Sequence, residues 1–260
     1  MKTLLLALVL AAAPASAREL KICADPNNLP FSNRAGEGFE NKLVEMIAAD
    51  LGATVTYVWW AQRRGNVRET LREGLCDLIP GVASSLETLG TTRPYYRSTY
   101  VAVTRADRKL DIGSFDDPRL KQFRLGVQLV GDDGANTPPA HALARRGIID
   151  NVQGYMIYGD YETAAPQADI LTALASGAID VAFVWGPVAG YFAQRQAVPL
   201  ALAPVAPQFD GPQSPMIFDI SMGVRKEDVA LRREVEEILA RRRTEVEALL
   251  RDYGVPAAAE

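Results

Sequence analysis

Polar and aromatic side chains follow several predicted strands of this sequence, and these side chains are the best placed to hold a ligand. Each group falls where an apolar, strand-like run gives way to turn-forming residues. In open α/β sheets ligands bind outside the carboxyl ends of the strands, so we expect one cleft with aromatic walls and a few polar anchors. The candidates are Asp25, Asn28, Phe31, Trp60, Gln62, Arg63, Thr92, Arg93, Tyr95, Asp132, Asp133, Asn136, Asp160, Tyr161 and Trp185. For any single tryptophan, core filling is an equally good interpretation.

Catalytic patterns are absent from the sequence. It contains no Gly-x-Ser-x-Gly elbow, no phosphate-binding Gly-rich loop and no metal-spaced set of histidines and cysteines. The only histidine, His141, lies in a predicted helix beside two arginines. Adjacent carboxylates such as Asp116 and Asp117 are typical of turns and caps. We therefore predict a binding module, not an enzyme, with no catalytic residue, no metal site and no cofactor.

The elements that position the candidates alternate between strand and helix. Such alternation predicts parallel sheets with right-handed crossovers. The predicted strands are 20–24, 54–60, 76–81, 95–104, 124–129, 152–157, 179–184, 198–205 and 218–224. The predicted helices are 38–52, 66–74, 140–146, 163–176 and 228–253, the last either continuous or broken once. The apolar face of the helix predicted over 228–253 is expected to pack on its own domain.

The first residues match a secretory signal. Lys2 precedes a short apolar run that ends in Pro14-Ala15-Ser16-Ala17, so residues 1–17 are predicted to be a signal peptide. No other run is long and apolar enough for a membrane helix, which predicts a periplasmic protein with no membrane insertion. The net charge of -4 argues against nucleic-acid binding, which needs a clustered basic surface.

Cys23 and Cys76 are the only cysteines. In an oxidising compartment they can pair, and we predict a disulfide between them. Two buried thiols are the alternative, because sequence does not show whether their Cα atoms are close enough to be bridged.

The order of these elements resembles type II periplasmic solute-binding proteins of ABC transporters over the whole mature chain. The similarity rests on the export signal, on Pro30-Phe31-Ser32, and on three motifs at 38–40, 93–96 and 221–225. It implies an α/β fold of two lobes joined by two hinge strands around a cleft. Lobe I would comprise residues 18–104 and 208–260, lobe II residues 105–207, with hinges near 102–107 and 203–210.

More narrowly, the motifs resemble the binding-protein-like family associated with pyrroloquinoline quinone methanol dehydrogenases, the MxaJ and XoxJ type. The motifs that carry this resemblance are 23–33, 38–41, 58–60, 74–77, 91–98, 136–139 and 184–187. Segments 131–139 and 62–65 are closer to the XoxJ branch, which belongs with lanthanide enzymes. The resemblance implies an accessory protein that assists or activates a quinoprotein methanol or alcohol dehydrogenase. We expect it to be a monomer when free and to bind the dehydrogenase through its interlobe cleft.

The sequence departs from the amino-acid receptors of this fold. Those receptors hold the ligand carboxylate with an arginine after the third strand and its ammonium with an aspartate in the second lobe. Here residues 83–88 contain no arginine and residues 184–186 no aspartate. An unpaired buried zwitterion would cost several kcal/mol, so an α-amino acid is a poor ligand. The alternative function is a transport receptor for another small molecule.

Overall fold

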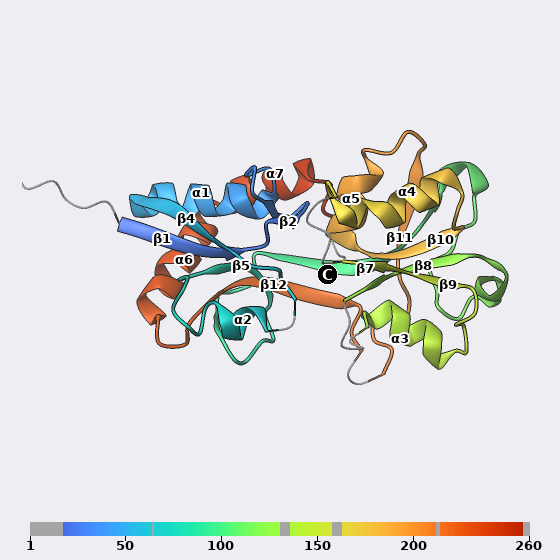
Figure 1. The fold of residues 1–260 in the computed structure, drawn as a ribbon, viewed down its shortest axis with the longest axis horizontal. Helices are drawn as coiled ribbons and strands as arrows, with labels where there is room; N and C mark the ends of the chain where they lie inside the picture. Colours follow the sequence, from blue (N-terminus) through green and yellow to red (C-terminus); the bar gives the residue numbers. More distant parts are fainter. Residues whose placement is uncertain (1–17, 64, 131–135, 158–162, 212–213, 257–260) are drawn as a thin grey trace, which may run out of the picture.

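Two α/β halves, joined by a sheet that passes through both, form the protein in a computed structural model that describes residues 18–63, 65–130, 136–157, 163–211 and 214–256 (Figure 1). The predicted signal peptide, residues 1–17, lies outside the described residues. We call the half that contains both ends of the described chain lobe I and the other half lobe II. The exact boundaries proposed from the sequence remain predictions.

Lobe I begins with a parallel strand pair. β1 (Arg18–Ala24) runs beside β4 (Ala53–Trp59), with Leu20 opposite Val55. Between them in the sequence lies α1 (Phe39–Leu51), in which apolar residues recur at helical spacing; Phe39, Leu43, Val44 and Ile47 among them are fully buried. The helix ends at Gly52, which takes the left-handed conformation that glycine adopts without steric cost.

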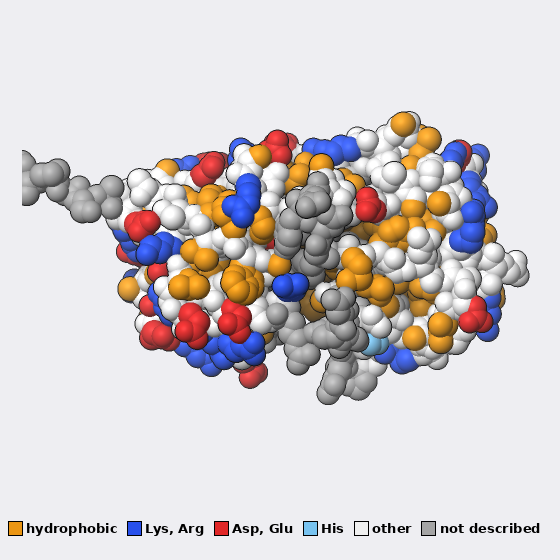
Figure 2. All heavy atoms as spheres, viewed as in Figure 1, with side chains coloured by type: hydrophobic (Ala, Val, Ile, Leu, Met, Phe, Trp, Pro, Cys, Tyr) orange, Lys and Arg blue, Asp and Glu red, His pale blue; other side chains and the backbone are white. Residues whose placement is uncertain are grey.

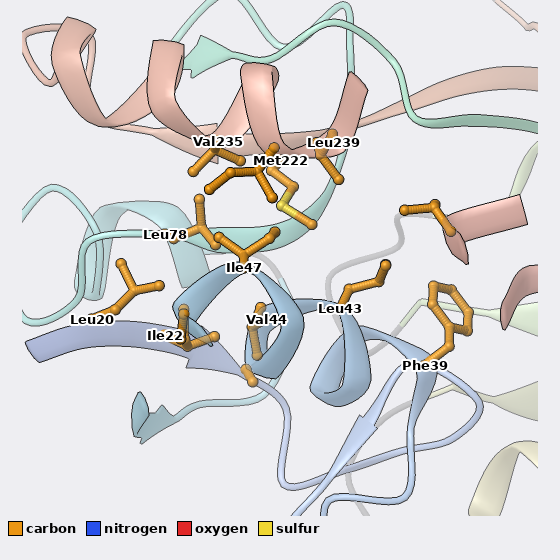
Figure 3. Packing of buried hydrophobic residues seen from close by; sticks show 14 of the residues in the cluster. Leu20, Ile22, Phe39, Leu43, Val44, Ile47, Leu78, Met222, Val235 and Leu239 are labelled. Carbon is orange, nitrogen blue, oxygen red and sulfur yellow. The ribbon is translucent and has the colours of Figure 1, made fainter. Parts of the chain in front are cut away.

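The core of lobe I lies between α1, the sheet and the C-terminal helices (Figure 3). Figure 3 shows α1 side chains directed toward Met222 and Val235, which come from the far end of the sequence. The predicted final helix is broken once, into α6 (Val229–Arg241) and α7 (Arg243–Asp252). Its apolar face packs on lobe I as expected, through Val235, Ile238, Leu239, Val246 and Leu250.

A long strand, β7 (Tyr96–Arg105), connects the lobes. Its first half pairs antiparallel with β12 (Ile217–Val224), and its second half pairs antiparallel with β10 (Val181–Trp185) and β11 (Leu200–Pro204). One sheet, in the order β5-β12-β7-β10-β8-β9, therefore passes through both lobes. The other strands in this order are β5 (Ile79–Ala83), β8 (Leu125–Leu129) and β9 (Val152–Met156), and the short strand β6 (Gly90–Thr91) pairs with β12.

Lobe II surrounds the strands β8, β9 and β10, which run parallel to one another. It includes α3 (Pro138–Arg145), α4 (Asp169–Ser176) and α5 (Gly186–Ala193), and Figure 1 places α4 and α5 on the opposite side of the sheet from α3. The helix predicted over 163–176 is shorter, because Pro166 begins the separate 3-10 turn η3 (Pro166–Ala168) before α4. The sequence analysis did not predict α5.

The short elements complete the fold. The helix predicted over 66–74 is reduced to α2 (Asn66–Glu69), after which the chain forms turns up to the second cysteine. The others are β2 (Asn27–Asn28), β3 (Ser32–Asn33), β6 (Gly90–Thr91), η1 (Ala106–Arg108) and η2 (Pro118–Gln122). Within the described ranges, every helix is too short or too polar to cross a bilayer.

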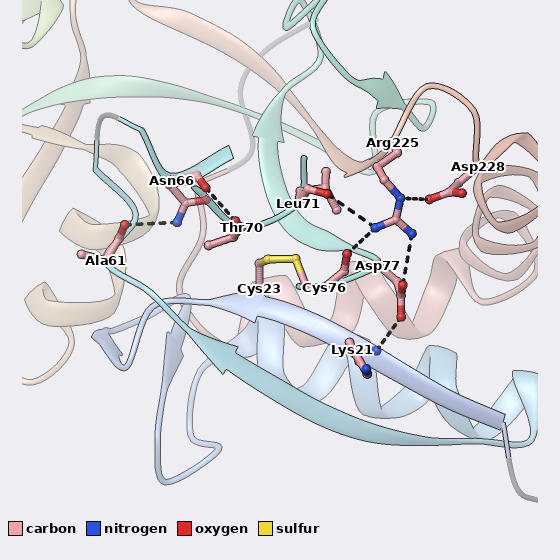
Figure 4. Close-up of a disulfide and its surroundings, with 10 residues drawn as sticks. All are labelled: Lys21, Cys23, Ala61, Asn66, Thr70, Leu71, Cys76, Asp77, Arg225 and Asp228. Atoms are coloured by element: carbon pink, nitrogen blue, oxygen red, sulfur yellow. Dashed lines mark hydrogen bonds and ion pairs between the residues drawn. A yellow bond between two sulfur atoms is a disulfide. The ribbon is translucent and has the colours of Figure 1, made fainter. Parts of the chain in front are cut away.

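The predicted disulfide is confirmed, because Cys23 and Cys76 are bonded with their Cα atoms 5.5 Å apart (Figure 4). It ties β1 to the turn before β5. Beside it, the Asp77 carboxylate accepts a hydrogen bond from the Lys21 backbone at 3.0 Å and from Arg225 at 3.2 Å. The bond and these contacts fix the strand end that the candidate site follows.

Candidate functional site

A cavity of about 370 Å³ lies at the junction of the two lobes. Its floor is the sheet itself, where β5, β12 and β7 run side by side. Residues directly opposite in adjacent strands point to the same face, so Ala83, Ile220 and Tyr96 form one row across the floor. The size falls within the range of small-molecule sites.

Aromatic rings dominate the walls of this cavity. Trp185 lies opposite Tyr100 in the sheet, with ring centroids 5.2 Å apart, and makes an edge contact with Phe218 at 5.8 Å. Phe31 and Tyr96 line the side formed by lobe I. On the face drawn in Figure 2, hydrophobic side chains gather on both sides of the lobe junction. The cavity therefore offers mainly apolar and π surface.

A chain of side-chain amides crosses the junction along the cavity. In lobe I, Asn28 donates to Gln62 at 2.9 Å. Across the junction, Gln167 donates to the Asn28 side-chain oxygen and accepts from Gln128 at 3.2 Å. Gln128 in turn accepts from the Trp185 backbone N–H at 2.8 Å. The two lobes are thus held together by hydrogen bonds between the protein's own groups.

Asp25 supports this site from behind instead of lining it. Its carboxylate accepts hydrogen bonds from the Asn27 backbone at 2.9 Å and from the Gln62 backbone at 2.8 Å. Its own carbonyl oxygen accepts from the Ser32 hydroxyl at 2.8 Å. Asp25 is 1% exposed. It therefore joins the loops that follow β1 and β4 and positions Asn28 and Gln62.

Glu40, in the first turn of α1, lines the cavity and is only 2% exposed. Burial and the proximity of Asp25 raise the pKa of its carboxyl to about 8. The Oε2 atom has no hydrogen-bond partner. The carboxyl lies against Gly81 of β5, and a Cβ at that position would collide with Oε1. The glycine thus provides the space that the carboxyl occupies.

The predicted site residues fall into several places. Asn28, Phe31, Gln62 and Trp185 line the cavity. Trp60 (39% exposed), Arg63 and Asn136 are exposed and do not line it. Those that lie outside the described residues are Asp132, Asp133, Asp160 and Tyr161.

Thr92, Arg93 and Tyr95 are held within lobe I. The Thr92 hydroxyl accepts from the Met222 backbone at 3.0 Å. Arg93 and Tyr95 line a second groove, between the start of β7 and the helices α6 and α7. These residues precede β7 and lie apart from the interlobe cavity, whereas the sequence pattern predicted them in the cleft, at the carboxyl end of a strand.

Sequence reasoning missed several cavity residues, namely Glu40, Tyr96, Tyr100, Gln128, Gln167 and Phe218. Gln128 lies near the end of a predicted strand, and Tyr96 and Tyr100 are four residues apart on one strand face. The position of a strand end and the alternation along a strand could therefore have identified these three residues. For Gln167 there was none, because its partner Asn28 is 139 residues away. Among the described residues, no group of three or more histidine, cysteine, aspartate or glutamate side chains could hold a metal ion.

The fold and the interlobe cavity together define a periplasmic-binding-protein architecture of type II. The chain belongs to the bacterial extracellular solute-binding proteins, family 3, whose model matches residues 20–255. Membership of an extracellular family agrees with the predicted periplasmic location.

Three relatives are similar over nearly the whole chain. Protein MoxJ of Methylorubrum extorquens is 32% identical, covering 94% of this chain and 83% of that protein. Protein MoxJ of Paracoccus denitrificans is 30% identical, covering 93% and 90%. The crystal structure of the periplasmic binding protein XoxJ from Methylobacterium extorquens AM1 is 37% identical and covers 93% of this chain and all of that one, with a TM-score of 0.74. These matches bear out the resemblance to the MxaJ and XoxJ type.

Proposed function

We propose that this protein is a non-enzymatic periplasmic accessory of a PQQ-dependent methanol dehydrogenase, closer to the lanthanide type, and that it binds the dehydrogenase through its interlobe cleft. The observation that carries the proposal is similarity to MoxJ and XoxJ over more than nine-tenths of the chain. The cavity supports it, since among the described residues its lining contains no arginine that could bind an amino-acid carboxylate.

The cleft suits a segment of a partner protein because it combines aromatic surface with amide groups. Trp185 lies in the cavity wall, and Trp60 is exposed at 39% in the loop after β4. Buried aromatic anchors contribute much of the binding energy at protein interfaces. Trp60 and Trp185 are therefore the residues whose loss should weaken the association most.

The test is titration calorimetry of the mature protein against the quinoprotein dehydrogenase encoded in the same operon. Wild-type protein should bind, and Trp185→Ala and Trp60→Ala should each weaken binding by roughly tenfold or more. Leu75→Ala is the matched control, because Leu75 is 48% exposed and lies outside the cavity. Absence of binding by the wild type would refute the accessory role.

A second candidate is a transport receptor for a small non-amino-acid ligand, favoured by the cavity volume of about 370 Å³. A panel of amino acids and small organic acids in the same calorimeter separates the two functions. Tight binding of one small molecule without response to the dehydrogenase would favour the receptor.

A further inference from the structure

The cavity contains one carboxyl group for which the fold supplies no partner. Glu40 is 2% exposed, its Oε2 atom makes no hydrogen bond, and no ion pair joins it to any described arginine or lysine. Leaving a buried carboxyl unpaired is costly, so a position of this kind is rarely retained for stability alone. Its place in the cavity wall indicates that a ligand group completes it.

The surroundings of Glu40 define the kind of group that fits. The titratable neighbours that face it are Asp25, behind the first strand, and the tyrosines Tyr57, Tyr95 and Tyr96. Burial raises the pKa of each of these tyrosines, so they stay neutral at pH 7. The local field is therefore negative, which repels an anion and attracts a cation.

The remaining cavity wall is aromatic and amide. The amides Asn28, Gln128 and Gln167 already bond to one another, which reduces their capacity to bind a polar ligand. Among the described lining residues, Glu40 is the only acidic or basic side chain. Aromatic rings around a single carboxyl attract ammonium and guanidinium groups through their π faces.

We propose that the interlobe cavity binds an organic cation with a short apolar stem, with the Glu40 carboxylate as its counter-charge and the aromatic walls around it. On binding, the Glu40 carboxyl releases its proton to the solvent and the ligand stays charged, so one carboxylate–ammonium pair replaces one neutral acid. The cation is either a free amine or a lysine or arginine side chain of a protein partner. The inference rests on the cavity and does not require the dehydrogenase.

The probe is n-butylammonium, titrated calorimetrically against n-butanol and butyrate as neutral and anionic analogues. Butylammonium should bind, and butanol and butyrate should bind at least tenfold more weakly. Titrations in two buffers with different ionisation enthalpies should reveal release of about one proton at pH 7. Since Glu40 must ionise, the affinity should rise about tenfold per pH unit from pH 6 to 7.5 and level off above about pH 8.5.

Glu40→Gln, which keeps the shape and removes the charge, should weaken butylammonium binding about 30-fold or more. Glu45→Gln is the matched control: it makes the same change on an exposed face of the same helix, outside the cavity, and should bind as wild type does. Both variants are first compared with wild type by circular dichroism. The proposal would be overturned if butanol and butylammonium bound equally well, or if Glu40→Gln bound butylammonium with the affinity of the wild type. An affinity that falls with rising pH would overturn it too.

A competition experiment distinguishes the two sources of the cation. If the dehydrogenase displaces butylammonium and binds Glu40→Gln more weakly, the cation is a side chain of the partner. If butylammonium binds while the dehydrogenase neither binds nor competes, the accessory role fails, but the cation site stands with a free amine as its ligand.

Discussion

Replacing Glu40 by glutamine should stabilise the protein at neutral pH, because a buried carboxyl that resists ionisation lowers the folded state's stability. Its pKa is raised from 4.5 to about 8 in the folded protein, whereas the unfolded chain ionises it near 4.5. Below pH 4.5 both states hold the proton and the cost is absent. Between pH 4.5 and about 8 the unfolded state alone ionises, so stability is lost as the pH rises.

The size of the effect follows from the two pKa values. Each pH unit between them corresponds to about 1.4 kcal/mol, so the cost reaches about 3 kcal/mol at pH 7 and about 5 kcal/mol at pH 9. Glutamine resembles the protonated acid and avoids this cost. For a chain of this size, the melting temperature of Glu40→Gln at pH 7 should exceed that of the wild type by roughly 6 to 12 °C.

The assay is thermal unfolding followed by circular dichroism from pH 4 to pH 9, with the difference between variant and wild type as the measured quantity. The difference should vanish near pH 4 and grow with pH. Glu45→Gln, on the exposed face of the same helix, should show no such growth. A Glu40→Gln difference that stays constant across this pH range would refute the reasoning, since the carboxyl would then ionise normally in the folded protein.

Three further perturbations test other parts of the structure. Replacing Cys76 by serine should lower the free energy of unfolding, measured with denaturant, by about 4 kcal/mol, because the disulfide closes a loop of 53 residues. A reductant should lower the stability of the wild type by the same amount and leave the variant unaffected. Gln167→Leu should enlarge the radius of gyration in small-angle scattering, since it cuts the amide chain between the lobes; an unchanged radius would contradict this. Gly190→Ala should lower the melting temperature, because the Cβ of the alanine would collide with the Gly254 carbonyl. An unaltered melting temperature would show that the backbone around Gly254 shifts to accommodate the Cβ.

Much of the fold could be predicted from local patterns. The apolar runs ending at Ala24 and Val184 marked strands, and alternation with amphipathic segments indicated the α/β class, because these signals lie within a few residues of one another. The disulfide was also predictable, since an exported chain with two cysteines has one possible intramolecular pair. The helix ends were less accurate, because the turns after Glu69 and at Pro166 depend on tertiary packing.

The site was predicted only in part, because its residues meet across large sequence separations. Asn28 and Trp185 could be found from strand ends, but the bond between Asn28 and Gln167 depends on how the lobes dock. Glu40 gave no signal of its own, since an acidic residue in the first turn of a helix is ordinary. Asp25 was expected to line the cleft, yet its carboxylate lies behind the cavity wall and accepts hydrogen bonds from backbone N–H groups.

The amide chain between the lobes has a consequence for communication with other proteins. A transporter recognises an occupied receptor because closure around the ligand changes the receptor's outline, and a ligand shifts such an equilibrium only by its differential affinity for the two shapes. Here the amides of Asn28, Gln167 and Gln128 already join the lobes, so a ligand gains little by closing them. A partner protein would therefore contact the same surface whether or not the cavity is filled. Such a surface suits a stable complex better than a receptor that signals ligand occupancy by changing its shape.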